Sequence, residues 1–205
     1  MVSGFTVPSD QPDGVYGVSC AENGTETHTL LARALSEEEF AQLTARNAHE
    51  ELTKPPSRIV SRQSDATFCG SSQQILDPGS TDKAVGALKD QCKPGAFNSG
   101  LNFYSKSGST VAYICNYGSN AWLCTRDDLT RDYAHITSIC GRYKSGWRVR
   151  WPQGNTGAQT GYETVNAKFA AVGPRPMWYS SARNETSKFW STCVCHEGSF
   201  LRSLV

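Results

Sequence analysis

The stretch Val111-Ala-Tyr-Ile-Cys115 decides the fold that we predict for this 205-residue chain. Apolar side chains stand at successive positions of this run, so both faces of the strand that it forms should be buried. A strand of that kind belongs in the centre of a sheet. Just before it, Leu101–Tyr104 predicts a short strand, and Lys106-Ser-Gly108 predicts the turn that joins the two.

Helical patterns flank this pair of strands. Residues 81–92 place apolar side chains on one face, and Pro94-Gly95 follows them. A second helix begins near Thr125 or Asp127, and Gly141 stands just past its end. Its apolar residues recur at intervals of four, three and four positions, as one face of a helix requires. They are Leu129, Tyr133, Ile136 and Cys140.

Two further strands are predicted after the second helix. Gly146–Trp151 alternates, with Trp and Val on one face and Arg148 and Arg150 on the other. Tyr162–Phe169 has the composition of another strand. Together the elements predict an α+β fold, a disulfide-stapled α/β sandwich with an antiparallel or mixed sheet and two core helices.

An N-terminal hairpin and helix precede this core. Residues 5–31 predict the hairpin, with Asn23-Gly24 at its turn. Residues 36–52 predict a helix, because Ser36 and Glu39 have the spacing of a capping box.

A linker rich in Pro, Ser and Arg, residues 53–66, suggests a division of the chain. We expect an N-terminal segment, residues 1–62, and a cysteine-rich core domain with an irregular tail, residues 63–205. Arg58 and Arg62 make residues 1–62 a candidate pro-segment. Two observations weaken that hypothesis: neither arginine belongs to a dibasic pair, and a disulfide from Cys20 to the core would keep the segment attached.

The cysteines point to an oxidising compartment. Their number is even, and only the last two lie as close together as paired zinc ligands do. Disulfides therefore explain the pattern best, and disulfides are typical of secreted proteins. The spacing does not determine which cysteines pair. The eight are Cys20, Cys69, Cys92, Cys115, Cys124, Cys140, Cys193 and Cys195.

Other features agree with an extracellular location. Asn23 and Asn184 each begin an Asn-x-Thr sequon, so we expect a glycoprotein. Residues 1–5 have neither the basic nor the apolar part of a secretory signal, and we expect the signal to have been removed. No run of 18 apolar residues occurs, which argues against a stable membrane span. A net charge of +1 without a basic run argues against nucleic acid as a partner.

Candidate catalytic and metal-binding residues are few. No Gly-x-Ser-x-Gly motif occurs. His28 could act with Glu26 and an arginine in a ribonuclease-like site, and His135 is a weaker candidate that we expect at the surface. Cys193-Val-Cys195-His196 has ligands for a soft metal but lacks a second cluster, so disulfides are favoured there. We therefore predict no catalytic residue, metal or cofactor.

Binding residues are predicted from charge and aromatic content. Arg148, Arg150 and Lys144 form the main local concentration of basic residues, and an anionic polymer or a partner with an acidic surface would suit them. The alternative is a solvated sheet face. Trp178 and Tyr179 lie in an irregular segment, where aromatic side chains can contact a protein or a glycan.

Five cysteine-bearing or flanking stretches carry a resemblance to a known family. They are Phe68-Cys69-Gly70, Leu88–Cys92, Val111–Tyr117, Ile136–Gly141 and Gly146-Trp147. In these stretches the chain resembles small secreted cysteine-rich proteins of filamentous fungi, with similarity to the Ecp2-type effector domain and, more distantly, to KP4-type killer toxins. The resemblance implies an α/β sandwich and a role outside the cell, with no shared catalytic residue.

Three functions follow as hypotheses. The first is a secreted non-enzymatic effector or elicitor, a virulence protein that binds a protein or glycan on a host or competitor surface. The second is a killer-toxin-like protein directed at a membrane or channel. The third is a small secreted hydrolase that uses His28 or His135 with a carboxylate.

Overall fold

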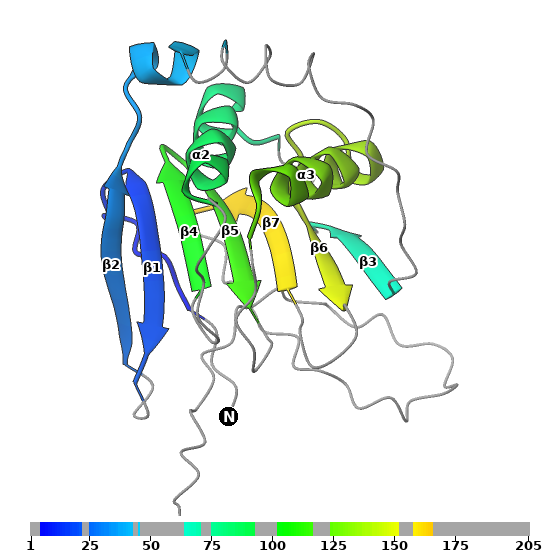
Figure 1. The fold of residues 1–205 in the computed structure, drawn as a ribbon, viewed down its shortest axis with the longest axis horizontal. Coiled ribbons are helices and arrows are strands. Elements are labelled where there is room, and N and C mark those ends of the chain that lie inside the picture. The colour runs from blue at the N-terminus through cyan, green and yellow to red at the C-terminus, as the bar shows by residue number, and fades with distance from the viewer. Residues whose placement is uncertain are drawn as a thin grey trace, which may run out of the picture.

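Seven strands form one antiparallel sheet in the order β2-β1-β4-β5-β7-β6-β3 (Figure 1). The structure is a computed structural model. It describes residues 5–21, 25–42, 45, 64–70, 75–92, 102–116, 124–151 and 158–165. The strands are β1 (Gly14–Cys20), β2 (Glu26–Arg33), β3 (Ser64–Cys69), β4 (Asn102–Ser107), β5 (Thr110–Asn116), β6 (Gly146–Trp151) and β7 (Ala158–Thr164). The predicted α+β class is confirmed, and the sheet is antiparallel rather than mixed.

Strand β5 lies in the middle of this sheet, as its composition predicts. Every residue from Thr110 to Asn116 is buried. The strand pairs with β4 on one side and β7 on the other. Gly108 makes the turn into β5 with a positive φ of 53°, a conformation that glycine adopts without strain.

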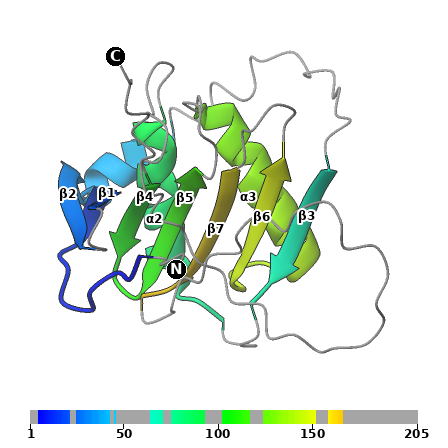
Figure 2. The ribbon, with the colours of Figure 1, turned by 90° about the horizontal axis from the view of Figure 1, so that it is seen from below.

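Two helices, α2 (Pro78–Gln91) and α3 (Arg126–Cys140), lie across one face of the sheet (Figures 1 and 2). The Asp77 side chain caps α2 by accepting the N–H of Ser80 at 2.7 Å. Thr125 caps α3 in the same way, and Gly141 follows its end with a φ of 96°. Helix α2 begins three residues earlier than predicted, because Asp77-Pro78 supplies both a cap and a proline suited to the first turn.

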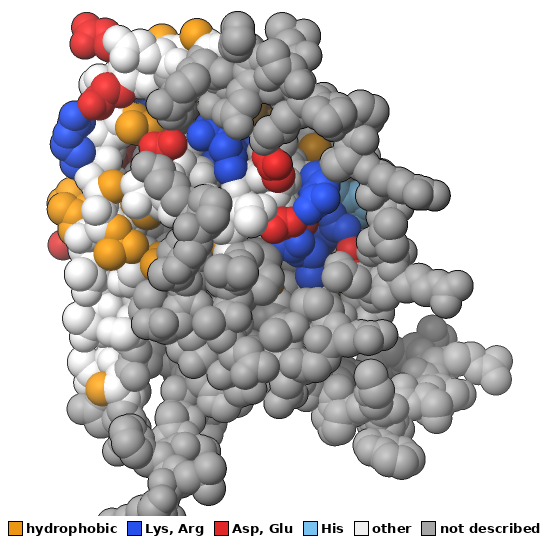
Figure 3. Space-filling model, in the orientation of Figure 1, with side chains coloured by type: hydrophobic (Ala, Val, Ile, Leu, Met, Phe, Trp, Pro, Cys, Tyr) orange, Lys and Arg blue, Asp and Glu red, His pale blue; other side chains and the backbone are white. Residues whose placement is uncertain are grey.

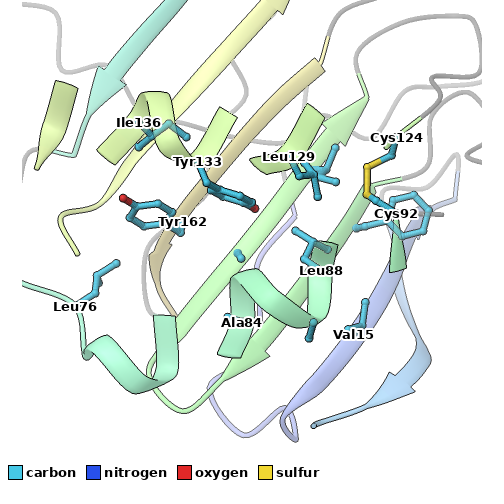
Figure 4. Close-up of a cluster of buried hydrophobic side chains, with 14 residues drawn as sticks. Val15, Leu76, Ala84, Leu88, Cys92, Cys124, Leu129, Tyr133, Ile136 and Tyr162 are labelled. Carbon is cyan, nitrogen blue, oxygen red and sulfur yellow. A yellow bond between two sulfur atoms is a disulfide. The ribbon is translucent and has the colours of Figure 1, made fainter. Parts of the chain in front are cut away.

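Hydrophobic clusters occupy both faces of the sheet. The first lies between the sheet and the helices (Figure 4), and the second lies on the opposite face. The first is built mainly from Val15, Leu76, Ala84, Leu88, Phe103, Ile114, Leu129, Tyr133, Ile136 and Tyr162. The second contains Phe5, Val7, Tyr16, Val18, Tyr104, Val111, Tyr113, Trp147, Val149 and Val165.

Disulfide bonds tie the helices to the rest of the fold. Cys69 at the end of β3 is bonded to Cys140 at the end of α3. Cys92, which follows α2, is bonded to Cys124 just before α3. Cys115 is also disulfide-bonded. The chain-entropy model assigns about 4.4 kcal/mol of stabilisation to Cys69–Cys140, whose cysteines are 71 residues apart. It assigns about 3.7 kcal/mol to Cys92–Cys124, whose cysteines are 32 residues apart.

The predicted N-terminal hairpin is present as β1 and β2, and a helix starts after Ser36. Residues 37–42 are helical, and the part of the prediction beyond them lies almost wholly outside the described residues. The capping box is formed in both directions: Glu39 N–H donates to Ser36 Oγ at 3.2 Å, and Ser36 N–H donates to Glu39 Oε2 at 2.8 Å. The adjacent Arg33 guanidinium and the Ser36 N–H lower the pKa of Glu39 to about 2.

Two predicted boundaries are wrong. Residues 64–66 were assigned to the linker, but they begin β3, whose polar residues pair with β6 at the sheet edge. Strand β7 starts at Ala158 and ends at Thr164, earlier than the predicted 162–169. Its first residues are small or polar, so hydrophobicity does not reveal them, although they are buried between β5 and β6.

The sheet also runs across the predicted boundary between residues 62 and 63. Strand β1 pairs with β4 over five positions, from Gly14 opposite Lys106 to Val18 opposite Asn102. Residues of the N-terminal segment thus contribute to both hydrophobic clusters. Within the described part of the chain, no helix combines the length and hydrophobicity that a membrane crossing needs.

Candidate functional site

The two arginines of β6 lie beside three aspartates, two on α3 and one on β3. We call Asp65, Asp128, Asp132, Arg148 and Arg150 the arginine–aspartate network. Arg148 donates to Asp132 Oδ1 at 3.2 Å and to Asp65 Oδ2 at 2.5 Å. Arg150 lies 2.9 Å from Asp132 Oδ2 and 3.6 Å from Asp128 Oδ1.

The arginine–aspartate network is largely shielded from solvent. The side chains of Arg148 and Arg150 are 16% and 14% exposed, and that of Asp132 is 1% exposed. The predicted alternation along β6 is confirmed, because Trp147 and Val149 are buried on the other face. The expectation of a solvated face is wrong, because α3 covers the face that carries the arginines.

Burial and neighbouring positive charge have opposite effects on the pKa values of the network's carboxyl groups. Burial raises the pKa of Asp132 above its ordinary value, although Arg150, Arg148 and the Thr160 hydroxyl favour its charged form. At Asp128, burial is outweighed by hydrogen bonds from Thr125 and Arg131 and by the charge of Arg150, so the pKa is lowered. Asp132 accepts hydrogen bonds from Arg148 and Thr160 and forms an ion pair with Arg150, and so acts as the centre of the network.

Lys144 does not join the two arginines in one basic surface. It is half-buried beyond the end of α3, where its N–H donates to the carbonyl oxygen of Gly141 at 3.3 Å. It also forms an isolated β-bridge with Ile75. The three predicted basic residues therefore stand in different environments.

A second polar group lies on the sheet face away from the helices. His28 Nδ1 is 3.0 Å from the Tyr104 hydroxyl, and His28 Nε2 is 3.5 Å from Glu26 Oε2. The structure therefore brings together His28 and Glu26, which are two of the three groups in the ribonuclease-like site that the sequence suggests. Burial, followed by the proximity of Tyr16 and Glu26, raises the pKa of Tyr104 well above its usual value, so its phenol stays protonated.

Both ring nitrogens of His28 face a polar neighbour. Nδ1 lies within hydrogen-bonding distance of the Tyr104 hydroxyl, and Nε2 lies beside the Glu26 carboxylate. Phe5, which is fully buried, packs its ring edge against His28 at a centroid distance of 6.3 Å. The histidine is thus held by neighbours on three sides.

Exposed apolar side chains lie on β2, at the edge of the sheet opposite to β3. Leu30 and Leu31 of edge strand β2 are 56% and 47% exposed. Figure 3 shows hydrophobic side chains grouped over this side of the molecule. We call Leu30 and Leu31 the β2 edge patch.

The two leucines lie on opposite faces of the strand, at a bulge in the β1–β2 pairing. The β1–β2 register shifts between Val15 and Tyr16, so that Leu31 has no opposite residue. Gly17 provides room beneath Leu31, whose Cδ1 would lie 3.5 Å from a Cβ at that position. The edge of β2 therefore presents apolar surface on both faces.

Sequence reasoning predicted this strand but missed its patch. Two adjacent leucines in a strand must face opposite sides, which indicates either a central strand that is covered on both faces or an edge strand with apolar surface. The place of the hairpin in the chain does not show which of these two kinds of strand it forms. Ile75 and Ile139 are the other large apolar side chains that are exposed among the described residues.

Several predicted site residues lie outside the described residues. These are Asn23, Asn184, Trp178, Tyr179, Cys193, Cys195 and His196. The side chain of Cys20 also lies outside them. His135 is exposed on α3, as predicted. Among the described residues, no group of three His, Cys, Asp or Glu side chains is arranged to hold a metal ion.

Comparisons with protein-family models, with curated proteins and with solved structures found no match to this chain.

Proposed function

We propose that this chain is a secreted, non-enzymatic protein that acts by binding a protein on a host or competitor surface. The observation that carries the proposal is the β2 edge patch. Exposed apolar side chains on an edge strand are unfavourable in water, and native proteins usually protect such edges with charge or cover. A surface that keeps Leu30 and Leu31 exposed is suited to a partner.

The disulfide bonds support an extracellular site of action. Cys69–Cys140 closes a long loop that contains α2 and α3, and Cys92–Cys124 closes one that contains β4 and β5. Bridges of this kind form and persist in oxidising compartments. An effector or elicitor released from the cell fits that requirement.

The arginine–aspartate network makes the two arginines less suitable for binding a partner than the apolar edge. Each arginine is already matched by aspartate carboxylates at 2.5–3.6 Å. An acidic partner would have to compete with these contacts. Burial of Leu30 and Leu31 on binding requires no such exchange.

We expect the double substitution Leu30→Ser and Leu31→Ser to weaken binding by at least about a hundredfold, since each buried leucine contributes about 1.5–3 kcal/mol. Labelled protein would be titrated onto a panel of intact plant protoplasts and fungal cells, and saturable binding would be measured. The matched control is Ile75→Ser with Ile139→Ser, which removes two exposed isoleucines elsewhere.

The control protein should bind as the wild type does, and both variants should keep the wild-type unfolding temperature. Equal binding by the leucine variant and the wild type would contradict the role of the β2 edge patch. Wild-type protein that shows no saturable binding to any surface of the panel would contradict the binding function itself.

The hydrolase hypothesis retains one favourable observation, the 3.5 Å approach of His28 Nε2 to Glu26 Oε2. The killer-toxin-like hypothesis stays a prediction from the resemblance.

A further inference from the structure

Aromatic side chains of three strands meet on the sheet face away from the helices. They are Tyr16 of β1, His28 of β2 and Tyr104 of β4. The Tyr16 and Tyr104 rings stack at a centroid distance of 5.1 Å, with 18° between their planes. The His28 ring stands edge-on to Tyr104 at 5.7 Å. We call these three residues the aromatic slot.

The slot is occupied by the chain's own N-terminal segment. The Phe5 ring stacks on Tyr104 at 5.7 Å with 22° between the planes, and it is fully buried. The next residue, Thr6, donates its backbone N–H to Glu26 Oε2 at 3.0 Å. Residues 5–8 belong to no helix or strand.

These contacts are those of a bound peptide rather than those of a sheet strand. The Phe5 ring stacks on Tyr104, and the Glu26 carboxylate accepts the N–H of the next residue, Thr6. These two contacts fix the direction of the backbone. The carboxylate also faces His28, which in turn contacts Tyr104. The receiving groups therefore contact one another as well as the segment.

We propose that the aromatic slot is a peptide-binding site, and that residues 5–7 are its tethered resident ligand. Its external ligand would be an extended peptide segment of another protein, with an aromatic side chain followed by a free backbone N–H. Tethering gives the resident segment a high effective concentration, so an external peptide binds when the segment is displaced or weakened. Leu30 of the β2 edge patch stands opposite Tyr16 in the β1–β2 register, but the slot residues are different from those of the patch, and the inference does not rest on the proposed function.

The test uses the full chain with Phe5→Ala, whose own segment can no longer fill the slot. A fluorescent peptide of residues 1–10 is titrated into it, and polarisation is measured. We expect saturable one-to-one binding, and at least tenfold weaker binding to the wild-type chain, where the slot is occupied. Two control peptides carry Phe5→Ala, which removes the ring, or Thr6→Pro, which removes the donated N–H. Each should bind at least tenfold more weakly.

Failure of the Phe5→Ala chain to bind the wild-type peptide, or equal binding of the control peptides, would overturn the proposal. If Phe5→Ala prevents folding, the test uses the wild-type chain instead, and the rate of deuterium exchange at the Thr6 amide is measured. Excess wild-type peptide should accelerate that exchange, and the Phe5→Ala peptide should not. Exchange that neither peptide changes would overturn the proposal.

Discussion

Replacing Asp132 with alanine lowers the free energy of unfolding by about 3–5 kcal/mol, because it leaves two buried guanidinium groups without their shared carboxylate. Asp132 is the centre of the arginine–aspartate network, and its side chain is 1% exposed. Breaking a buried ion network on one side is costly because the remaining charges stay desolvated. Urea denaturation of the oxidised protein measures the effect.

Two further variants separate the cost of unpaired charge from the loss of packing. Asp127→Ala removes an exposed carboxylate from the same helix and should cost less than about 1 kcal/mol. The triple variant Asp132→Leu, Arg148→Met and Arg150→Met removes the central charges together, and we expect it to recover most of the stability. Equal stabilities of Asp132→Ala and Asp127→Ala would contradict the structural role of the network.

Removal of residues 1–62 abolishes the stable fold. The deletion takes away β1 and β2, and it leaves the edge of β4 without its partner. It also uncovers Tyr104, and it removes the Asp13 carboxylate that lies 2.8 Å from Lys106 Nζ. We expect the chain of residues 63–205 to lose its near-ultraviolet circular dichroism and its cooperative unfolding.

Complementation provides the control for this deletion. Residues 1–62, added as a separate polypeptide, should restore the near-ultraviolet spectrum, because the interface between the two parts includes a paired strand and apolar side chains. A chain of residues 63–205 that unfolds cooperatively on its own would contradict the account and favour the pro-segment hypothesis.

The sequence predicts well those elements whose burial matches a simple period. The run from Val111 to Cys115 is apolar throughout, and it lies buried in the middle of the sheet. The spacing from Leu129 to Cys140 and the following Gly141 likewise place α3 and its end, because capping and periodicity are local properties. Disulfide formation could be predicted from the cysteine content, but the pairing depends on tertiary structure.

The partners of charged side chains could not be predicted in the same way. Arg148 and Arg150 are correctly placed on one face of β6, but the sequence of a strand does not show what covers that face. Asp65 lies far from them in the chain and reaches Arg148 only through β3–β6 pairing. Long-range strand order also determines that Leu30 stands on an edge strand, and local patterns do not contain that order.

The proposed extracellular role requires, before anything else, an oxidised, cross-linked chain. Peptide mapping of the natively released protein without reduction, after alkylation of any free thiols, tests that claim. We predict the linked pairs Cys69–Cys140 and Cys92–Cys124, and no alkylated thiol among the eight cysteines. Alkylated Cys69, Cys92, Cys124 or Cys140 in the folded protein would contradict it.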